Sequence, residues 1–148
     1  MTKVKFPKGL KVIYYTSKTK GDPDDFPETH YDPIRDELHL NLLESEELNL
    51  NPPLTIAHEL YHREQFKRLK AIKNTRASKI LYDYPVERLY LELEAQLVSK
   101  EMDNLDVSKE VRNLKETALN YYKIPEESWN KMVKAAQKRA REYAKGKQ

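Results

Sequence analysis

The segment LTIAHELYHREQF (residues 54–66) decides how the chain is interpreted, because it places two histidines four positions apart in a helical pattern. On an α-helix, positions i and i+4 lie one turn apart on the same face, so His58 and His62 can both reach one metal ion. Glu59 lies about 100° around the helix axis from His58, too far to be a natural third ligand but close enough to touch a water on that ion. This spacing is the pattern in which two histidines hold Zn²⁺ and the glutamate acts as general base.

The residues around this segment predict a helix from about 53 to 72. Pro52 and Pro53 favour a helix start, and Asn51 is a candidate N-cap. The apolar residues fall on more than one side of the helix, as expected for a helix that passes through a core. A short motif also arises by chance, so a helix, burial and a third ligand are needed to support it.

The composition predicts one helix-rich domain spanning residues 1–148, of α+β class with a short N-terminal β-sheet. Charged residues make up 34% of the chain and cysteine is absent, so a metal site must use histidine and carboxylate ligands. The net charge of +3 is too small to indicate a nucleic-acid partner. We see no apolar run of transmembrane length and no signal-peptide core, so we expect a cytoplasmic protein without a membrane partner.

The N-terminal third predicts strands within residues 4–43. Residues 4–6 and 10–15 are rich in β-branched and aromatic side chains, and residues 17–32 form a loop, either of solvated turn residues or a flap beside a cleft. Residues 36–43 alternate between apolar and polar side chains, which indicates a half-buried strand. If this strand borders a cleft, it can pair with an extended substrate, which makes His39, Leu40 and Asn41 candidate substrate-binding residues. The alternative is that His39 is an ordinary exposed strand residue.

The rest of the chain predicts helices at about 85–104 and 107–145, the latter range divided by a break near Pro125. We expect a connection of mixed character at residues 74–83. Glu92 and Glu94 lie among apolar residues, where glutamate is rare unless it is paired or bound to a metal. The alternative is that one of the two faces solvent. The basic C-terminal residues suit a solvated helix face better than a nucleic-acid site, because no reader motif accompanies them.

Two features together resemble the gluzincin metallopeptidases: AHELYH (residues 57–62) after an alternating strand, and ELEAQ (residues 92–96) about 30 residues later. The chain looks closest to the smallest members, the minigluzincins, and to ImmA/IrrE-type proteins. The resemblance covers roughly residues 36–100 and implies a zincin-like fold whose second, "glutamate" helix supplies the third zinc ligand. In many members, the sequence motif of that helix is Glu-x-x-Ala followed by Asp or Asn. The match places Glu92 as ligand and Ala95 at the small position, with Gln96 departing from the pattern and Glu94 as the reserve ligand.

The resemblance implies a zinc-dependent metallopeptidase that acts on a peptide or protein substrate. One Zn²⁺ per chain would be held by His58, His62 and Glu92, with water in the fourth position. Glu59 would accept the proton of that water and pass it to the leaving amine. The donor that stabilises the oxyanion stays open among the ten tyrosines. The alternative function is a latent or non-proteolytic zinc-binding regulatory protein that keeps the motif.

Overall fold

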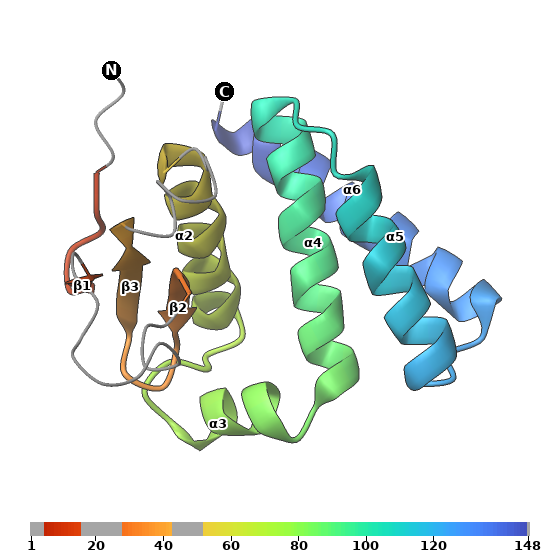
Figure 1. Ribbon diagram of the computed structural model, residues 1–148, viewed down its shortest axis with the longest axis horizontal. Helices are drawn as coiled ribbons and strands as arrows, with labels where there is room; N and C mark the ends of the chain where they lie inside the picture. Colours follow the sequence, from red (N-terminus) through yellow and green to blue (C-terminus); the bar gives the residue numbers. More distant parts are fainter. Residues whose placement is uncertain (1–4, 16–27, 43–51, 148) are drawn as a thin grey trace. The chain divides into compact units, whose positions relative to one another are not determined.

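The computed structural model describes residues 5–15, 28–42 and 52–147, and the chain divides into two compact units between Ser78 and Lys79. Each unit is described by itself. The described residues form three strands, five α-helices and one π-helical segment, η2 (Figure 1). The predicted α+β class, dominated by helices and with a small sheet near the N-terminus, is confirmed. The prediction of one domain across residues 1–148 stays a prediction.

The first unit contains a three-stranded sheet in the order β1-β3-β2. Strand β1 (Lys11–Tyr15) runs parallel to β3 (Glu37–Asn41), and β2 (His30–Asp32) runs antiparallel to β3. Strands β1 and β3 lie within the ranges that the sequence predicted. Lys5 and Phe6, predicted as part of a further strand, are exposed and not in a strand. They have no neighbouring strand in the described sheet, and propensity alone does not form a strand.

Strand β2 corrects the prediction of a continuous loop up to Asp32. The turn after it explains why a three-residue strand forms here: the Asp32 carboxylate accepts a hydrogen bond from the main-chain N–H of Ile34 at 2.9 Å. Asp36 completes the turn with a φ of 53°, a left-handed conformation that aspartate tolerates better than most residues. The turn folds β2 back onto β3, with His30 opposite His39 and Asp32 opposite Glu37.

The central position of β3 bears on a second prediction, which stays a prediction. The sequence suggested that this strand could border a cleft and pair with a substrate through His39, Leu40 and Asn41. Over Glu37–His39 the strand is paired on both sides, with β1 and with β2. The main-chain N–H of Asn41 donates to the Thr29 hydroxyl at 2.9 Å. Strand β3 is therefore the middle of the sheet, and β-augmentation would need an outer strand instead.

Helix α2 (Pro52–Arg68) packs on one face of this sheet (Figure 1). The core between them contains Leu38 and Leu40 from β3 and Ile56 from α2. Partly buried side chains of Leu10, Val12 and Leu60 pack against this core. The predicted alternation of β3 is confirmed for Leu38 and Leu40, whereas Leu42, just past the strand, is 40% exposed.

Helix α2 ends at Arg68, four residues before the predicted end. Lys70 adopts a left-handed conformation with a φ of 54°. Its N–H bonds to the carbonyl of Lys67 at 3.0 Å, and the N–H of Ala71 bonds to the carbonyl of Phe66 at 2.8 Å. These two bonds form a Schellman motif with lysine at the position that glycine usually occupies. The apolar pattern therefore continues past the helix, with Ala71 buried in the connection.

Helix α3 (Thr75–Tyr82) lies where the sequence predicted only a connection. Asn74 caps its start, because the Asn74 side-chain oxygen accepts from the main-chain N–H of Ala77 at 3.1 Å. Ala77 and Ile80 are buried, three residues apart on one side of the helix. The cap and the packing of the two buried side chains stabilise this short helix in the folded chain.

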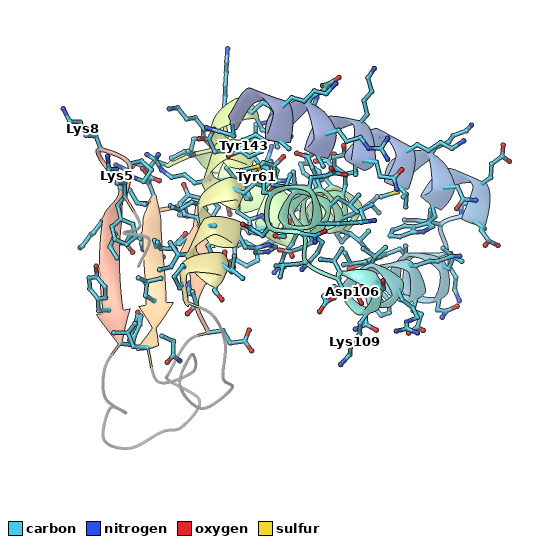
Figure 2. The ribbon with its side chains drawn as sticks, turned by 90° about the horizontal axis from the view of Figure 1, so that it is seen from above. Lys5, Lys8, Tyr61, Asp106, Lys109 and Tyr143 are labelled. Atoms are coloured by element: carbon cyan, nitrogen blue, oxygen red, sulfur yellow. The ribbon has the colours of Figure 1, made fainter. Side chains whose placement is uncertain are left out.

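The second unit contains α4 (Pro85–Asp103), α5 (Ser108–Glu116), η2 (Thr117–Tyr121) and α6 (Glu126–Lys147), and α4 lies alongside α6 in Figure 1. All of them lie close to the predicted ranges. The spacing of five apolar residues in the sequence predicts a packing stripe along this helix: Trp129, Met132, Val133, Ala136 and Ala140. Trp129, Ala136 and Ala140 are buried and the other two partly buried, which confirms the stripe. Asp106 lies just before α5 and Lys109 lies in its first turn, and both are exposed (Figure 2). The Asp106 carboxylate accepts a hydrogen bond from the main-chain N–H of Ser108 at 3.0 Å.

Some predictions fall outside the described residues: the Asn51 cap, the part of the 17–32 loop before residue 28, and the outermost strand residues 4 and 43. None of the helices in the described part of the chain combines the length and apolar character that a membrane span requires.

Candidate metal centre

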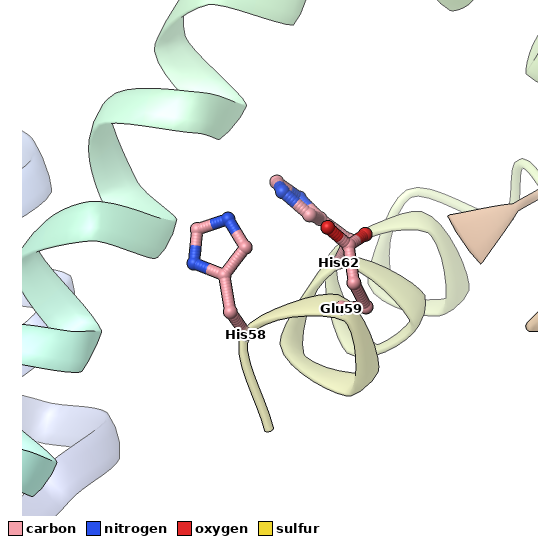
Figure 3. Close-up of side chains that lie close together, drawn as sticks. All are labelled: His58, Glu59 and His62. Carbon is pink, nitrogen blue, oxygen red and sulfur yellow. The ribbon is translucent and has the colours of Figure 1, made fainter. Parts of the chain in front are cut away.

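Helix α2 brings His58, Glu59 and His62 together (Figure 3). One ligand atom from each of the three side chains lies within 4.8 Å of those of the other two. The two imidazole rings are 4.8 Å apart between centroids and perpendicular to each other. The sequence predicted that both histidines share one helix face, and the structure shows this arrangement.

The histidine face of α2 is turned away from the sheet. Ile56 and Leu60 pack on the sheet side, and at 100° per residue His58 and His62 fall on the opposite side of the helix. His62 is nevertheless only 7% exposed, and its Nε2 atom is buried. A buried imidazole nitrogen that carries a lone pair is stabilised by a hydrogen-bond donor or by a metal ion.

Gln65 orients His62, and the sequence did not single it out. The Nδ1 atom of His62 donates to the Gln65 side-chain oxygen at 2.8 Å, and Gln65 is fully buried. With the proton on Nδ1, the lone pair of the neutral ring lies on Nε2, the atom that would bind a metal. One signal in the sequence points to this role: Gln65 follows His62 by three residues and lies on the same helix face.

Glu59 contacts the main chain of β2. Its Oε2 atom accepts a hydrogen bond from the main-chain N–H of Tyr31 at 3.0 Å. An ionised carboxylate can accept several hydrogen bonds, so this bond restrains the group while leaving acceptor capacity. The three-residue strand that the sequence missed therefore positions the predicted general base.

An ion pair beside the site fixes β2 and its turn to α2. Arg63 donates from Nε and Nη2 to the two carboxylate oxygens of Asp36, at 2.9 and 3.1 Å. The hydroxyl of Tyr31 donates to Asp36 Oδ1 at 2.7 Å. The hydrogen bonds from Arg63 lower the pKa of Asp36, and Asp36 raises the pKa of Arg63. Burial, followed by the bond to Asp36, raises the pKa of Tyr31, so its hydroxyl stays protonated and keeps donating.

Glu92 and Glu94 lie in the other unit, on α4. Glu94 is fully buried, whereas Glu92 is partly exposed. Ala95, predicted at the small position, is 1% exposed. The alternative that one of the two glutamates faces solvent therefore applies better to Glu92.

The chain was compared with models of protein families, with curated proteins and with solved structures. None of these comparisons gives a significant match. The functional interpretation therefore depends on the chemistry of the residues.

The donor set on α2 fits a divalent transition-metal ion. Imidazole nitrogen is the ligand that Zn²⁺, Cu²⁺ and Ni²⁺ favour, and two imidazoles on one turn of a helix can bind one ion. The bond from Gln65 to the other ring nitrogen of His62 is the kind of outer contact that orients a metal-binding histidine. The carboxylate of Glu59 lies beside the pair and accepts a hydrogen bond from the main chain of β2.

Proposed function

We propose that this protein is a zinc-dependent metallopeptidase of the gluzincin type, with a zincin-like fold and a peptide or protein substrate in the cytoplasm. The observation that carries the proposal is the cluster of His58, Glu59 and His62 on α2, with all three ligand atoms within 4.8 Å. The bond between His62 and Gln65 supports it, because it orients one imidazole for metal binding.

His58 and His62 would hold one Zn²⁺ together with a carboxylate from α4. When bound, zinc lowers the pKa of a coordinated water to about 7 and polarises the carbonyl of the peptide bond. Glu59 accepts the proton of the attacking water and delivers it to the leaving amine. The main-chain N–H of Tyr31 donates to Glu59 Oε2 and restrains the orientation of this carboxylate during both transfers.

The proposed third ligand is a glutamate of α4, and two arguments point to different residues. The resemblance to the gluzincins favours Glu92. Burial favours Glu94, because a fully buried carboxylate is rare without an ion or a cation to neutralise it.

We expect Glu94→Gln and Glu92→Gln to have unequal effects on zinc affinity, because only the ligand contributes a charged oxygen to the ion. The variant that removes the ligand should bind zinc at least about tenfold more weakly, a loss of about 1.4 kcal/mol. Competition with a zinc-sensitive dye measures both variants side by side. Equal, unchanged affinities in the two variants would contradict the assignment of the third ligand to this pair.

Gln65→Leu should weaken zinc binding by about 10–100-fold, the usual effect of removing the group that orients a metal-binding histidine. The leucine side chain is similar in volume but cannot accept a hydrogen bond from His62 Nδ1. Gln137→Leu, a partly buried glutamine on α6, is the matched control and should leave zinc affinity unchanged. If zinc binds Gln65→Leu as tightly as the unmodified chain, Gln65 does not position His62.

Removal of the metal tests the function as a whole. Treatment with a chelator should abolish hydrolysis of an unfolded protein such as casein, and added zinc should restore it. His58→Ala should lower the zinc content, measured by elemental analysis, and should not regain activity with zinc. Zinc binding at α2 without hydrolysis of any peptide would favour the alternative, a latent or regulatory zinc-binding protein. Hydrolysis that survives full removal of metal would overturn the proposal.

A further inference from the structure

A second group of possible metal ligands lies on the sheet, away from α2. It contains Asp32 of β2 with Glu37 and His39 of β3, and one ligand atom from each lies within 4.8 Å of the others. Each of the three side chains is 13% exposed. They are therefore much less exposed than charged surface residues usually are.

The register of the hairpin explains how these residues meet. Asp32 lies directly opposite Glu37, and His39 follows Glu37 by two residues on the same face of β3. Leu38 and Leu40, which alternate with them, face the core under α2. The cluster therefore lies on the outer face of the sheet and is separate from the histidines of α2.

The cations that pair with the carboxylates of this cluster are on exposed side chains. Two carboxylates directly opposite each other on paired strands repel, which weakens the hairpin. The nearby cations are on long, exposed side chains: Lys11 lies 3.7 Å from Glu37 and is 71% exposed, and Arg35 lies 3.1 Å from Asp32 and is 69% exposed. Exposed ion pairs of this kind contribute little, so a bound dication would neutralise the two carboxylates much better.

His39 is oriented as a metal-binding histidine would be. Its Nδ1 atom and the Tyr15 hydroxyl are hydrogen-bonded at 2.7 Å, and its Nε2 atom lies 3.2 Å from Glu37 Oε1. The ring lies between two others, stacked on His30 at 4.7 Å and on Tyr15 at 5.7 Å between centroids. Both ring nitrogens therefore have a hydrogen-bond partner. A bound ion would take the place of the proton between Nε2 and Glu37, while the Tyr15 hydroxyl would keep its bond to Nδ1 and orient the ring.

We propose that Asp32, Glu37 and His39 bind a second divalent transition-metal ion, of the Zn²⁺ or Mn²⁺ kind, which mixed carboxylate and imidazole ligands suit. The ion would clamp β2 to β3 from the outer face. Because the Tyr31 N–H between His30 and Asp32 holds Glu59, a clamp on β2 would also steady the carboxylate beside the first site. The site itself does not depend on the proposed peptidase function.

Zinc titration of the full chain by calorimetry tests this site. We expect two equivalents of Zn²⁺ for the unmodified chain, one for Asp32→Asn/Glu37→Gln, and one for His58→Ala/His62→Ala. Two equivalents retained in Asp32→Asn/Glu37→Gln would overturn the second site. A single equivalent that disappears in His58→Ala/His62→Ala would also overturn it. A single equivalent that disappears in Asp32→Asn/Glu37→Gln would instead support the second site and count against the proposed function.

Mn²⁺ locates the ion directly and does not depend on activity. In His58→Ala/His62→Ala, substoichiometric Mn²⁺ should broaden the amide resonances of β1, β2 and β3 in NMR spectra, because this ion relaxes nearby protons. Broadening that is strongest outside these strands, or none, would contradict the site. Unfolding in the presence of chelator shows whether each variant folds before its metal binding is compared.

Arg35→Ala supplies a second variant in which a folding defect does not mimic the expected result. Arg35 competes with the ion for the Asp32 carboxylate, so its removal should tighten zinc binding at this site by several-fold. Tyr15→Phe should weaken binding about tenfold, because the partner of His39 Nδ1 is lost. Weaker binding in Arg35→Ala would show that Asp32 is not a ligand.

Discussion

Glu59→Gln should keep its zinc and lose peptide hydrolysis by a factor of about 10²–10⁴, the usual contribution of a positioned general base. Glutamine nearly matches glutamate in shape, and its oxygen can still accept from the Tyr31 N–H, so the surroundings of α2 stay intact. The amide cannot accept the proton of the attacking water. Initial rates on an unfolded protein substrate, together with zinc content by elemental analysis, measure the two effects separately.

Glu64→Gln is the matched control for this experiment. It removes the same charge from the same helix, at an exposed position, and should leave the rate unchanged. If Glu59→Gln hydrolysed peptides at the rate of Glu64→Gln, Glu59 would not be the base and the proposed mechanism would be wrong. If both variants lost activity together, the effect would come from the charge of α2 rather than from proton transfer.

The second large effect concerns stability. Asp36→Ala should lower the free energy of unfolding by about 3–5 kcal/mol, the usual cost of breaking one side of a buried ion pair. The substitution leaves Arg63 and the Tyr31 hydroxyl without the carboxylate to which both donate. Arg63→Ala should have a comparable effect, and the double variant should cost less than the sum, because both changes remove the same interaction. Urea unfolding measures all three.

Lys67→Ala, which removes an exposed cation from α2, is the control for Arg63→Ala and should change stability by less than about 0.5 kcal/mol. Additive effects of Asp36→Ala and Arg63→Ala would mean that the two side chains do not stabilise the fold as a pair.

The ion pair of Asp36 and Arg63 makes the stability of the fold depend on pH. Its hydrogen bonds hold the pKa of Asp36 below the ordinary value of 3.8. A group whose pKa is lower in the folded state stabilises the fold fully above the unfolded pKa, and this contribution is lost as the pH falls through the folded pKa. Stability should therefore fall below about pH 4 and more steeply in the unmodified chain than in Arg63→Ala. Equal slopes in urea unfolding series at pH 2–6 would contradict this.

The sequence predicted the elements whose pattern is long and regular. The apolar pattern of α2, the alternation around Leu38 and the buried stripe of α6 each persist over several turns or residues, so periodicity is enough to find them. The arrangement of Glu59 and the two histidines follows directly from the predicted helix, because a helix fixes the relative positions of its residues. These predictions needed no knowledge of distant contacts.

The features that the sequence missed depend on contacts that are distant or on unusual backbone conformations. Strand β2 is three residues long and forms because Asp32 and Asp36 shape its turn. Helix α2 ends early because Lys70, not a glycine, takes the left-handed position. The role of Gln65 in orienting His62 follows from the hydrogen bond between the two side chains, which the structure shows. Pairing, turns and buried polar contacts of this kind are decided by the fold as a whole.

The donor that restrains Glu59 is the peptide group at position 31 and not the tyrosine side chain. Every amino acid except proline supplies the same N–H, so replacing the side chain at this position preserves the restraint as long as the strand persists. A single-residue deletion in the turn between β2 and β3 acts differently, because it shifts the strand by one step and points the neighbouring peptide groups the other way. The carboxylate is thus insensitive to most substitutions at residue 31 and sensitive to the length of the turn that follows it.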